Sequence, residues 1–191
     1  MNWFPDYNYI LASKSPRRSQ LLKSLGIPFT VRTKEVDEVY PSGLSNAEVP
    51  VFLAKLKAAP FLYEITEKDL IITADTVVCL NKAILGKPAN YNEAFQMLES
   101  LSGIQHQVIT GVCLTSKLKS NSFSATTNVQ FKLLTKDEID YYISTFQPYD
   151  KAGAYGIQEW IGAIGIKNIQ GSFYNVMGLP VQKLYEKIKS F

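Results

Sequence analysis

The sequence predicts an α/β protein built on a mixed sheet with flanking helices. Apolar runs of strand length alternate along the chain with segments whose apolar residues recur at helical spacing. Residues that favour helix starts stand before several of the helical segments. With 191 residues, the chain is long enough for one α/β domain or for one domain built as two lobes around a cleft. We predict a single domain over residues 1–191.

The first elements follow a strand–helix–strand order. Residues 7–13 read as a strand, and a helix follows at once, with Ser15 as N-cap and Pro16 in the first position. Gly26 is the expected end of this helix. Residues 29–33 read as a second strand.

A second helix and a long buried strand come next. Residues 45–48 have the form of a capping box and open a helix that tolerates Pro50 in its first turn. Residues 69–80 form a continuous apolar strand interrupted by one carboxylate, Asp75. A further helix covers residues 92–101. The apolar positions of the two helices are Val49, Phe52, Leu53, Leu56, Ala94, Met97, Leu98 and Leu101.

The second half of the chain begins with two paired strands. Residues 106–114 and 124–134 are these strands, joined by a polar turn. Residues 135–138 form another capping box before a helix. Residues 151–165 are rich in glycine and too irregular for a long helix. A last helix carries Val181, Leu184, Tyr185 and Ile188.

Composition and charge exclude several classes of protein. With 20 basic against 17 acidic residues, the net charge of +3 is too small for a dedicated nucleic-acid-binding surface. Cys79 and Cys113 each lie in an apolar run and read as buried thiols, because a zinc site would need more ligands than these and His106. Neither a signal peptide nor a membrane-spanning run is present. We therefore expect a soluble, cytoplasmic protein without a nucleic-acid or membrane partner.

The segment SKSPRRS is the strongest candidate for an anion site. It places Arg17 and Arg18 in the first turn of a helix, where the helix dipole disfavours each cation by about 0.3–1 kcal/mol unless an anion joins it. Free backbone amides and the hydroxyls of Ser13 and Ser15 complete a phosphate site at this junction. The alternative is that both arginines are solvated. The sequence does not decide which arginine faces the site more directly.

Two further candidates lie inside predicted elements. Asp75 in a buried strand is costly unless it is paired, which makes it a candidate general base or metal ligand, with Thr76 beside it. A structural carboxylate at a turn is the alternative. Lys57 continues the apolar stripe of its helix, so its ammonium either follows the helix surface to water or points into an anionic cleft.

Three candidates lie in predicted loops. Lys87 sits in a rigid turn before a helix, and Glu38 lies in the acidic run EVDEV. Each reads by itself as an ordinary surface residue. Gln158 follows a run of small residues and offers a donor and an acceptor that suit the edge of a base, although a plain tight turn explains the glycines equally well.

Taken together, these residues supply four cations, two or more carboxylates and an amide. They are the equipment for metal-assisted attack of water on a polyphosphate. The sequence has no P-loop, no dinucleotide-binding glycine fingerprint and no histidine-rich metal motif.

Several motifs of the chain resemble one protein family. The segments LASKSPRRSQLLKSLGIPF, ADTVV, GKP with AFQMLESLSGIQHQVITGV, and DKAGAYGIQ with GSFYNVMGLPV resemble the Maf family of nucleoside triphosphate pyrophosphatases. The match is collinear over residues 10–184. It implies the fold of inosine triphosphate pyrophosphatases, an elongated mixed sheet with two lobes and a deep cleft. It also implies cleavage between the α- and β-phosphates with a divalent cation, Mg²⁺ or Mn²⁺.

The resemblance also implies a substrate class. Members acting on dTTP and UTP carry an arginine after Ser-Pro, a threonine after the catalytic aspartate and a glutamine after AYGI, and this chain has Arg17, Thr76 and Gln158 there. The family is described as removing non-standard nucleotides and was first linked to septum formation. A homodimer is one alternative for the oligomeric state.

The remaining family residues map onto the candidates already named. The catalytic aspartate of the family matches Asp75, and its acidic loop residue matches Glu38, with Glu35 and Asp37 as alternatives in the same run. The family lysines and serines match Lys57, Lys87, Ser13 and Ser15.

The expected mechanism follows from this mapping. Asp75 activates water, directly or through a metal that Glu38 helps to hold, for attack on the α-phosphorus. The residues expected to neutralise the triphosphate are Arg18, Lys57 and Lys87, with hydrogen bonds from Ser13 and Ser15; those expected to read the base are Arg17, Thr76 and Gln158. The rivals are a nucleotide-binding regulator of septation and a purine-analogue triphosphatase.

Overall fold

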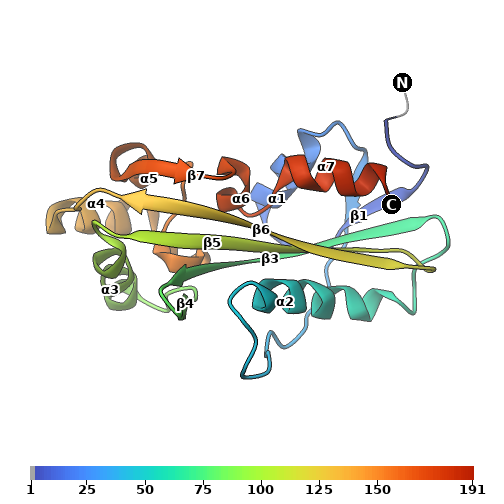
Figure 1. The fold of residues 1–191 in the computed structure, drawn as a ribbon, viewed down its shortest axis with the longest axis horizontal. Coiled ribbons are helices and arrows are strands. Elements are labelled where there is room, and N and C mark those ends of the chain that lie inside the picture. Colours follow the sequence, from blue (N-terminus) through green and yellow to red (C-terminus); the bar gives the residue numbers. More distant parts are fainter. Residues whose placement is uncertain (1–2) are drawn as a thin grey trace. The chain divides into compact units, whose positions relative to one another are not determined.

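A mixed sheet forms the centre of the protein. The computed structural model describes residues 3–191 (Figure 1). The strand order is β2-β1-β3-β5-β6-β7, with β4 paired to β3. The strands are β1 (Asn8–Leu11), β2 (Phe29–Val31), β3 (Asp69–Leu80), β4 (Ala83–Leu85), β5 (Gln105–Thr115), β6 (Ser120–Phe131) and β7 (Ile166–Gln170). Pairs β1–β2 and β1–β3 are parallel, whereas β3–β4 and β6–β7 are antiparallel.

Helices connect and flank the strands. The α-helices are α1 (Pro16–Lys23), α2 (Glu48–Ala58), α3 (Tyr91–Leu101), α4 (Lys136–Phe146), α5 (Trp160–Gly165), α6 (Phe173–Met177) and α7 (Val181–Lys189). Short 3₁₀ turns cover Ala59–Phe61, Pro148–Asp150 and Ala152–Ala154. No described helix is both long and apolar enough to cross a membrane.

The chain divides into two compact units. Unit 1 comprises Met1–Asp75, Thr110–Ala125 and Gly178–Phe191. Unit 2 comprises Thr76–Ile109 and Thr126–Met177. The boundaries fall inside β3, β5 and β6, so each of these strands contributes residues to both units.

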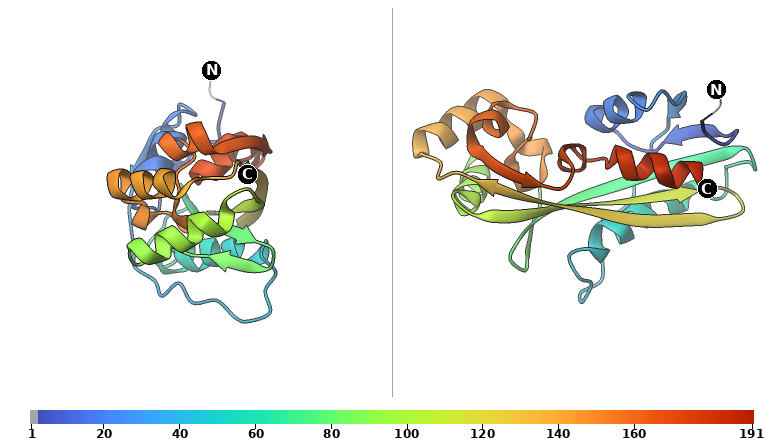
Figure 2. Two further views of the ribbon diagram at one scale, coloured as in Figure 1. Left: turned by 90° about the vertical axis from the view of Figure 1, so that its left-hand side faces the viewer. Right: turned by 45° about the horizontal axis from the view of Figure 1, so that its top comes forward.

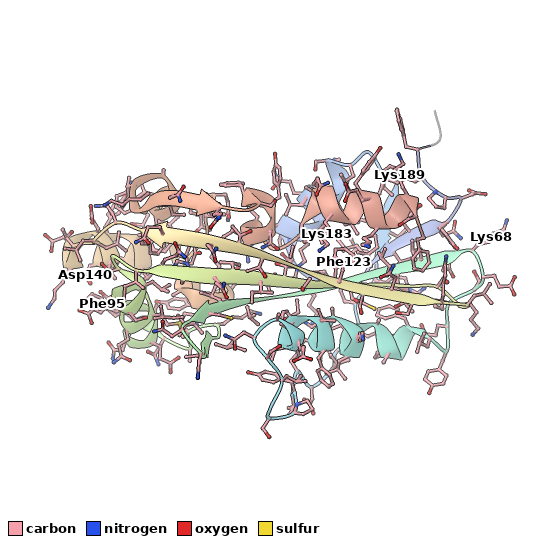
Figure 3. The ribbon with its side chains drawn as sticks, viewed as in Figure 1. Lys68, Phe95, Phe123, Asp140, Lys183 and Lys189 are labelled. Carbon is pink, nitrogen blue, oxygen red and sulfur yellow. The ribbon has the colours of Figure 1, made fainter. Side chains whose placement is uncertain are left out.

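In unit 1, helices cover both faces of the strands. Figures 1 and 2 show α2 on one face and α1 with α7 on the other. Apolar side chains of β1 and β3 supply the core, because the parallel register sets Ile10 beside Ile71, and both pack with Phe61. Lys183 of α7 donates a hydrogen bond to the Ser124 carbonyl and lies over the ring of Phe123, which fastens α7 to β6 (Figure 3).

Helix α2 lies unusually close to β5. A Cβ atom built on Gly111 would stand 2.3 Å from the carbonyl carbon of Pro50 and from the amide nitrogen of Val51. Only a residue without a side chain lets the helix backbone approach the strand this closely. Thr73 of β3 adds a hydrogen bond from its hydroxyl to the Ala54 carbonyl at 2.7 Å. The position of α2 is therefore fixed by two neighbouring strands.

Unit 2 has its own apolar core between α3, α4 and the strand segments of the unit. Leu98 and Leu101 of α3 pack with Ile139 and Tyr142 of α4. A hydrogen bond from the Tyr91 hydroxyl to the Asp140 carboxylate links the same two helices. The apolar spacing of both helices thus faces a shared interior.

The only histidine is buried in unit 2. His106 lies against the rings of Phe131 and Tyr155, and its Nε2 is 2.7 Å from the Tyr155 hydroxyl oxygen. Burial lowers the pKa of His106 to about 4. The side chain is therefore a neutral core residue.

The structure confirms the predicted α/β class with a mixed sheet and flanking helices. Ser15 caps α1, and Thr135 with Glu138 forms the predicted capping box of α4. The capping box predicted at residues 45–48 forms only in part: the Glu48 carboxylate accepts from the Ser45 amide at 2.8 Å, but the Ser45 hydroxyl donates to the same carboxylate, and α2 begins after Ala47. Two lobes around a cleft remain a prediction.

Replacing Gly111 with alanine tests the close approach of α2 to β5. The added methyl group meets backbone atoms that have no room to move, so we expect Gly111→Ala to lower the free energy of unfolding by about 1–3 kcal/mol. Urea denaturation measures this loss. Gly86→Ala is the matched control, because no atom lies within 4 Å of its added Cβ. Equal stability of the two variants would contradict the packing described.

The buried His106 makes stability depend on pH. Its pKa is lower in the folded protein than the 6.5 of an exposed histidine, so the unfolded chain binds the proton first as pH falls. Stability from this residue is complete above pH 6.5 and is lost toward pH 4, by about 2 kcal/mol between pH 7 and pH 5. Urea titrations at both pH values should give a smaller difference for the double variant His106→Phe, Tyr155→Phe. If the double variant showed the same difference in unfolding free energy between the two pH values, protonation of His106 would not be its cause.

Candidate active site

An ion pair between α2 and β3 is the central feature of the site. Lys57 Nζ donates a hydrogen bond to Asp75 Oδ1 at 2.5 Å, and the two side chains are only 17% and 12% exposed. Strand residues two apart point to the same face, so Thr73 and Asp75 both face α2. Thr73 contacts Ala54, and Asp75 contacts Lys57, one helical turn further on. Lys57 thus points inward, one of the two alternatives left by the sequence.

Glu38 joins this ion pair from the loop after β2. Its Oε1 lies 3.1 Å from Lys57 Nζ, and its side chain is 52% exposed. Glu35, the first sequence alternative, pairs instead with Lys14 at the surface. Asp37 accepts a backbone hydrogen bond from Val39 in a local turn. Of the three acidic residues considered, the structure places Glu38 beside Lys57.

The junction of β1 and α1 has a different hydrogen-bonding pattern from the one expected. The Ser15 amide donates to Ser13 Oγ at 3.2 Å, and the Arg18 amide donates to Ser15 Oγ at 3.4 Å. Both amides are therefore hydrogen-bonded within the protein, whereas the sequence predicted that they are free. The hydroxyls and the guanidinium groups are the side-chain hydrogen-bond donors at this junction.

Arg18 lies near enough to Asp75 and Glu38 for their charges to favour its protonated form. Its Nε donates to the Gly178 carbonyl at 2.9 Å. Desolvation lowers the pKa of Arg18, and the carboxylates of Asp75 and Glu38 oppose this shift. Part of the negative charge expected to balance this cation therefore comes from the protein itself. The contact with Gly178 could not be predicted from the sequence, although GLP belongs to a motif of the family resemblance.

Three predicted residues belong to unit 2. Thr76 directly follows Asp75 in β3 and is half-buried, whereas Lys87 and Gln158 are exposed. Their two loops are joined, because the Gly153 amide donates to the Gly86 carbonyl at 3.0 Å. Gly153 has φ +67°, and a Cβ there would stand 2.9 Å from Val78, so this crossing requires glycine.

The carboxylates of unit 1 suit a hard divalent cation. Asp75 and Glu38 converge on one point, since both lie within 3.1 Å of the same ammonium nitrogen. Magnesium typically uses one or two carboxylates and takes its other ligands from phosphates and water. No group of three or more histidine, cysteine, aspartate or glutamate side chains that suits a metal occurs in residues 3–191. The two-carboxylate arrangement fits an ion shared with a phosphate substrate.

A comparison with models of protein families identifies the family of this chain. The family model described as Maf-like protein matches residues 8–191. The chain belongs to the Maf family. This match covers every residue of the candidate site, from Ser13 to Gln158.

Relatives of this Maf protein carry a specific name. A protein of Phocaeicola vulgatus named dTTP/UTP pyrophosphatase is 54% identical, with 96% of this chain and 95% of the relative covered. A protein of Bacteroides thetaiotaomicron with the same name is 52% identical over the same shares. One from Flavobacterium psychrophilum is 47% identical, covering 95% and 93%.

Solved structures give a weaker similarity. The Ham1 protein of Staphylococcus aureus has a TM-score of 0.43 and 14% identity, with 65% of this chain and 71% of that chain covered. This similarity is too low to bear on the site.

Metal binding tests the assignment of Glu38 over Glu35. Both glutamates lie in one loop, but only Glu38 shares Lys57 with Asp75. We expect Glu38→Gln and Asp75→Asn to weaken Mn²⁺ binding about tenfold or more, measured by electron paramagnetic resonance with a nucleotide present. Glu35→Gln should bind Mn²⁺ as the unaltered protein does. If only Glu35→Gln weakened Mn²⁺ binding, the metal ligand in this loop would be Glu35 and not Glu38.

Proposed function

We propose that this Maf protein hydrolyses dTTP and UTP to the nucleoside monophosphate and pyrophosphate. The observation that carries the proposal is the buried Lys57–Asp75 pair, with Glu38 on the same ammonium and with Arg18 under the electrostatic influence of both carboxylates. The relatives named above, about half identical over nearly the whole chain, support the substrate class.

Asp75 is the proposed acceptor of a proton from the attacking water. Lys57 holds Oδ1 of this carboxylate, and we assign proton acceptance to Oδ2. Because α2 and β3 are rigid elements, the carboxylate keeps one orientation toward the α-phosphorus. Oxygen from water forms a bond to the α-phosphorus as the bond from this phosphorus to the α–β bridging oxygen breaks, and that oxygen leaves with pyrophosphate.

Cations and hydroxyls are the proposed ligands of the triphosphate. Arg18 and Lys57 neutralise its charge in unit 1, with hydrogen bonds from Ser13 and Ser15. Lys87 of unit 2 is assigned to the leaving pyrophosphate. A divalent cation, Mg²⁺ or Mn²⁺, held by Asp75 and Glu38, would supply charge neutralisation and lower the pKa of bound water.

Three further residues are assigned to the base. Arg17, Thr76 and Gln158 occupy the positions that distinguish the pyrimidine-specific subgroup in the family resemblance. Gln158 offers an amide whose donor and acceptor match the edge of uracil or thymine. We also propose a cytoplasmic location. The link to cell division and the homodimer remain predictions.

A substrate panel with two variants tests the proposed activity. We expect dTTP and UTP, with Mg²⁺ or Mn²⁺, to yield the monophosphate and pyrophosphate, and purine analogues to react more slowly. Asp75→Asn should retain nucleotide binding but lower kcat at least about 100-fold, because the proton acceptor is lost. Coupled detection of pyrophosphate measures the rate, and equilibrium dialysis measures binding.

Lysines of the same helix provide the matched control. Lys57→Met should also lower kcat strongly, whereas Lys55→Met, at an exposed position of α2, should leave it unchanged. Nucleotide binding without any pyrophosphate would indicate a binding protein instead. Preference for inosine or xanthosine triphosphate would indicate the purine-analogue alternative.

A further inference from the structure

Gln158 stands at the exposed end of a tightly held loop. Gly153, Ala154, Tyr155, Gly156 and Ile157 are all buried, whereas Gln158 is exposed. Ala154 has φ +59°, a left-handed conformation that a non-glycine residue adopts at a cost. The loop keeps this conformation because neighbouring groups hold it.

Glu159, the next residue, is the centre of those contacts. Its Oε2 accepts a hydrogen bond from the Tyr142 hydroxyl, and its Oε1 lies 3.1 Å from Lys151 Nζ. The Tyr142 hydroxyl oxygen also accepts from the Gly156 amide at 3.0 Å, so one side chain of α4 fixes both sides of Gln158. Burial, and then the bond to Glu159, raises the pKa of Tyr142, which keeps it a donor.

Glu159 occupies the N-cap position of α5, yet its side chain makes no capping hydrogen bond. An N-cap side chain ordinarily accepts from amides of its own helix. The Glu159 carboxylate is turned toward Tyr142 and Lys151 instead. The carboxylate is therefore committed to the loop rather than to the helix that it begins.

The same carboxylate also contacts the Gln158 amide. Gln158 Nε2 donates to Glu159 Oε1 over a long distance of 3.5 Å. An ionised carboxylate only accepts hydrogen bonds, so it attracts the NH₂ end of the amide and repels the carbonyl end. Without such a neighbour, an exposed glutamine amide can turn by half a rotation and exchange donor for acceptor.

Amide orientation decides which pyrimidine the residue can recognise. Uracil and thymine present an acceptor oxygen at C4 and a donor N–H at N3, whereas cytosine presents a donor amine at C4 and an acceptor at N3. A glutamine locked in one orientation complements one of these edges, and a freely turning glutamine complements both.

We propose that Glu159, held by Tyr142 and Lys151, is a specificity-determining residue that fixes the Gln158 amide to distinguish uracil and thymine from cytosine. This inference rests on the proposed function, because Gln158 must contact the base. Glu159 acts through Gln158 and is a positioning residue, not a catalytic one.

The decisive variant is Glu159→Gln. It keeps the shape of the side chain, but its amide can donate as well as accept, so the Gln158 amide is free to turn. We expect the ratio of kcat/KM for dTTP to that for dCTP to fall about tenfold or more, mainly through a gain with dCTP. Tyr142→Phe should also lower this ratio, because the Glu159 carboxylate loses its hydrogen bond from the Tyr142 hydroxyl and keeps only its ion pair with Lys151.

Two surface residues give matched controls. Glu99→Gln makes the same chemical change at an exposed site of α3, and Tyr141→Phe removes the hydroxyl of the exposed neighbour of Tyr142. Both should keep the ratio of the unaltered protein. The double variant Gln158→Ala, Glu159→Gln should be no less selective than Gln158→Ala alone, because the two residues act as one unit.

A measurement without substrate separates this inference from the proposed activity. The side-chain NH₂ signal of Gln158 in ¹⁵N–¹H spectra, assigned by its loss in Gln158→Ala, should shift in Glu159→Gln and not in Glu99→Gln. Normal dTTP hydrolysis with an unchanged signal and an unchanged dTTP to dCTP ratio would overturn the positioning role. A shifted signal in a protein that hydrolyses no nucleotide would uphold the contact and refute the proposed function, and with it the role in specificity.

Discussion

The pairing of Lys57 with Asp75 is the interaction on which the proposed chemistry of unit 1 depends. A carboxylate inside an apolar strand is costly unless an opposite charge and hydrogen bonds compensate it. The compensation comes from a lysine whose helix is pressed onto the sheet at Gly111 and bonded to Thr73. The packing of α2 thus determines where the ammonium lies. Glu38 and Arg18 then add charges of both signs around the same carboxylate.

In unit 2, a buried charge pair is compensated in the same way, but it holds a loop. Lys151 and Glu159 are mostly buried charges that compensate each other, and Tyr142 supplies the additional hydrogen bond. In unit 1, the pair contains the proposed proton acceptor, Asp75, and the lysine that holds it. In unit 2, the paired charges hold a strained loop whose exposed residue is proposed to select the base. Under these proposals, a buried charge pair serves the reaction in one unit and the positioning of a loop in the other.

Much of the fold and most of the candidate residues could be predicted from the sequence. Helical spacing and end signals located α1, α3, α4 and α7, and the apolar run of β3 was predicted residue for residue. The short strands β4 and β7 and the helix α6 were missed, because their few residues carry too little periodicity to stand out. The capping box before α2 forms only in part, because the Ser45 hydroxyl as well as the Ser45 amide donates to the Glu48 carboxylate, and the helix begins two residues later than predicted.

The sequence could not settle the contacts made across long separations. Whether Lys57 points inward depends on Asp75, 18 residues away, and the choice of Glu38 over Glu35 depends on which one meets Lys57. The Gly178 carbonyl that holds Arg18 is 160 residues distant. The contacts of Glu159 with Tyr142 and Lys151 could not be predicted either, because an acidic residue before a short helix is typical of an ordinary helix start.

In the proposed reaction, water attacks the α-phosphorus with Asp75 as its proton acceptor. Hydrolysis of dTTP in water enriched with ¹⁸O, followed by mass spectrometry of both products, shows which phosphorus is attacked. We expect the heavy oxygen in the thymidine monophosphate and none in the pyrophosphate. Heavy oxygen in the pyrophosphate would place the attack on the β-phosphorus and contradict the proposed chemistry.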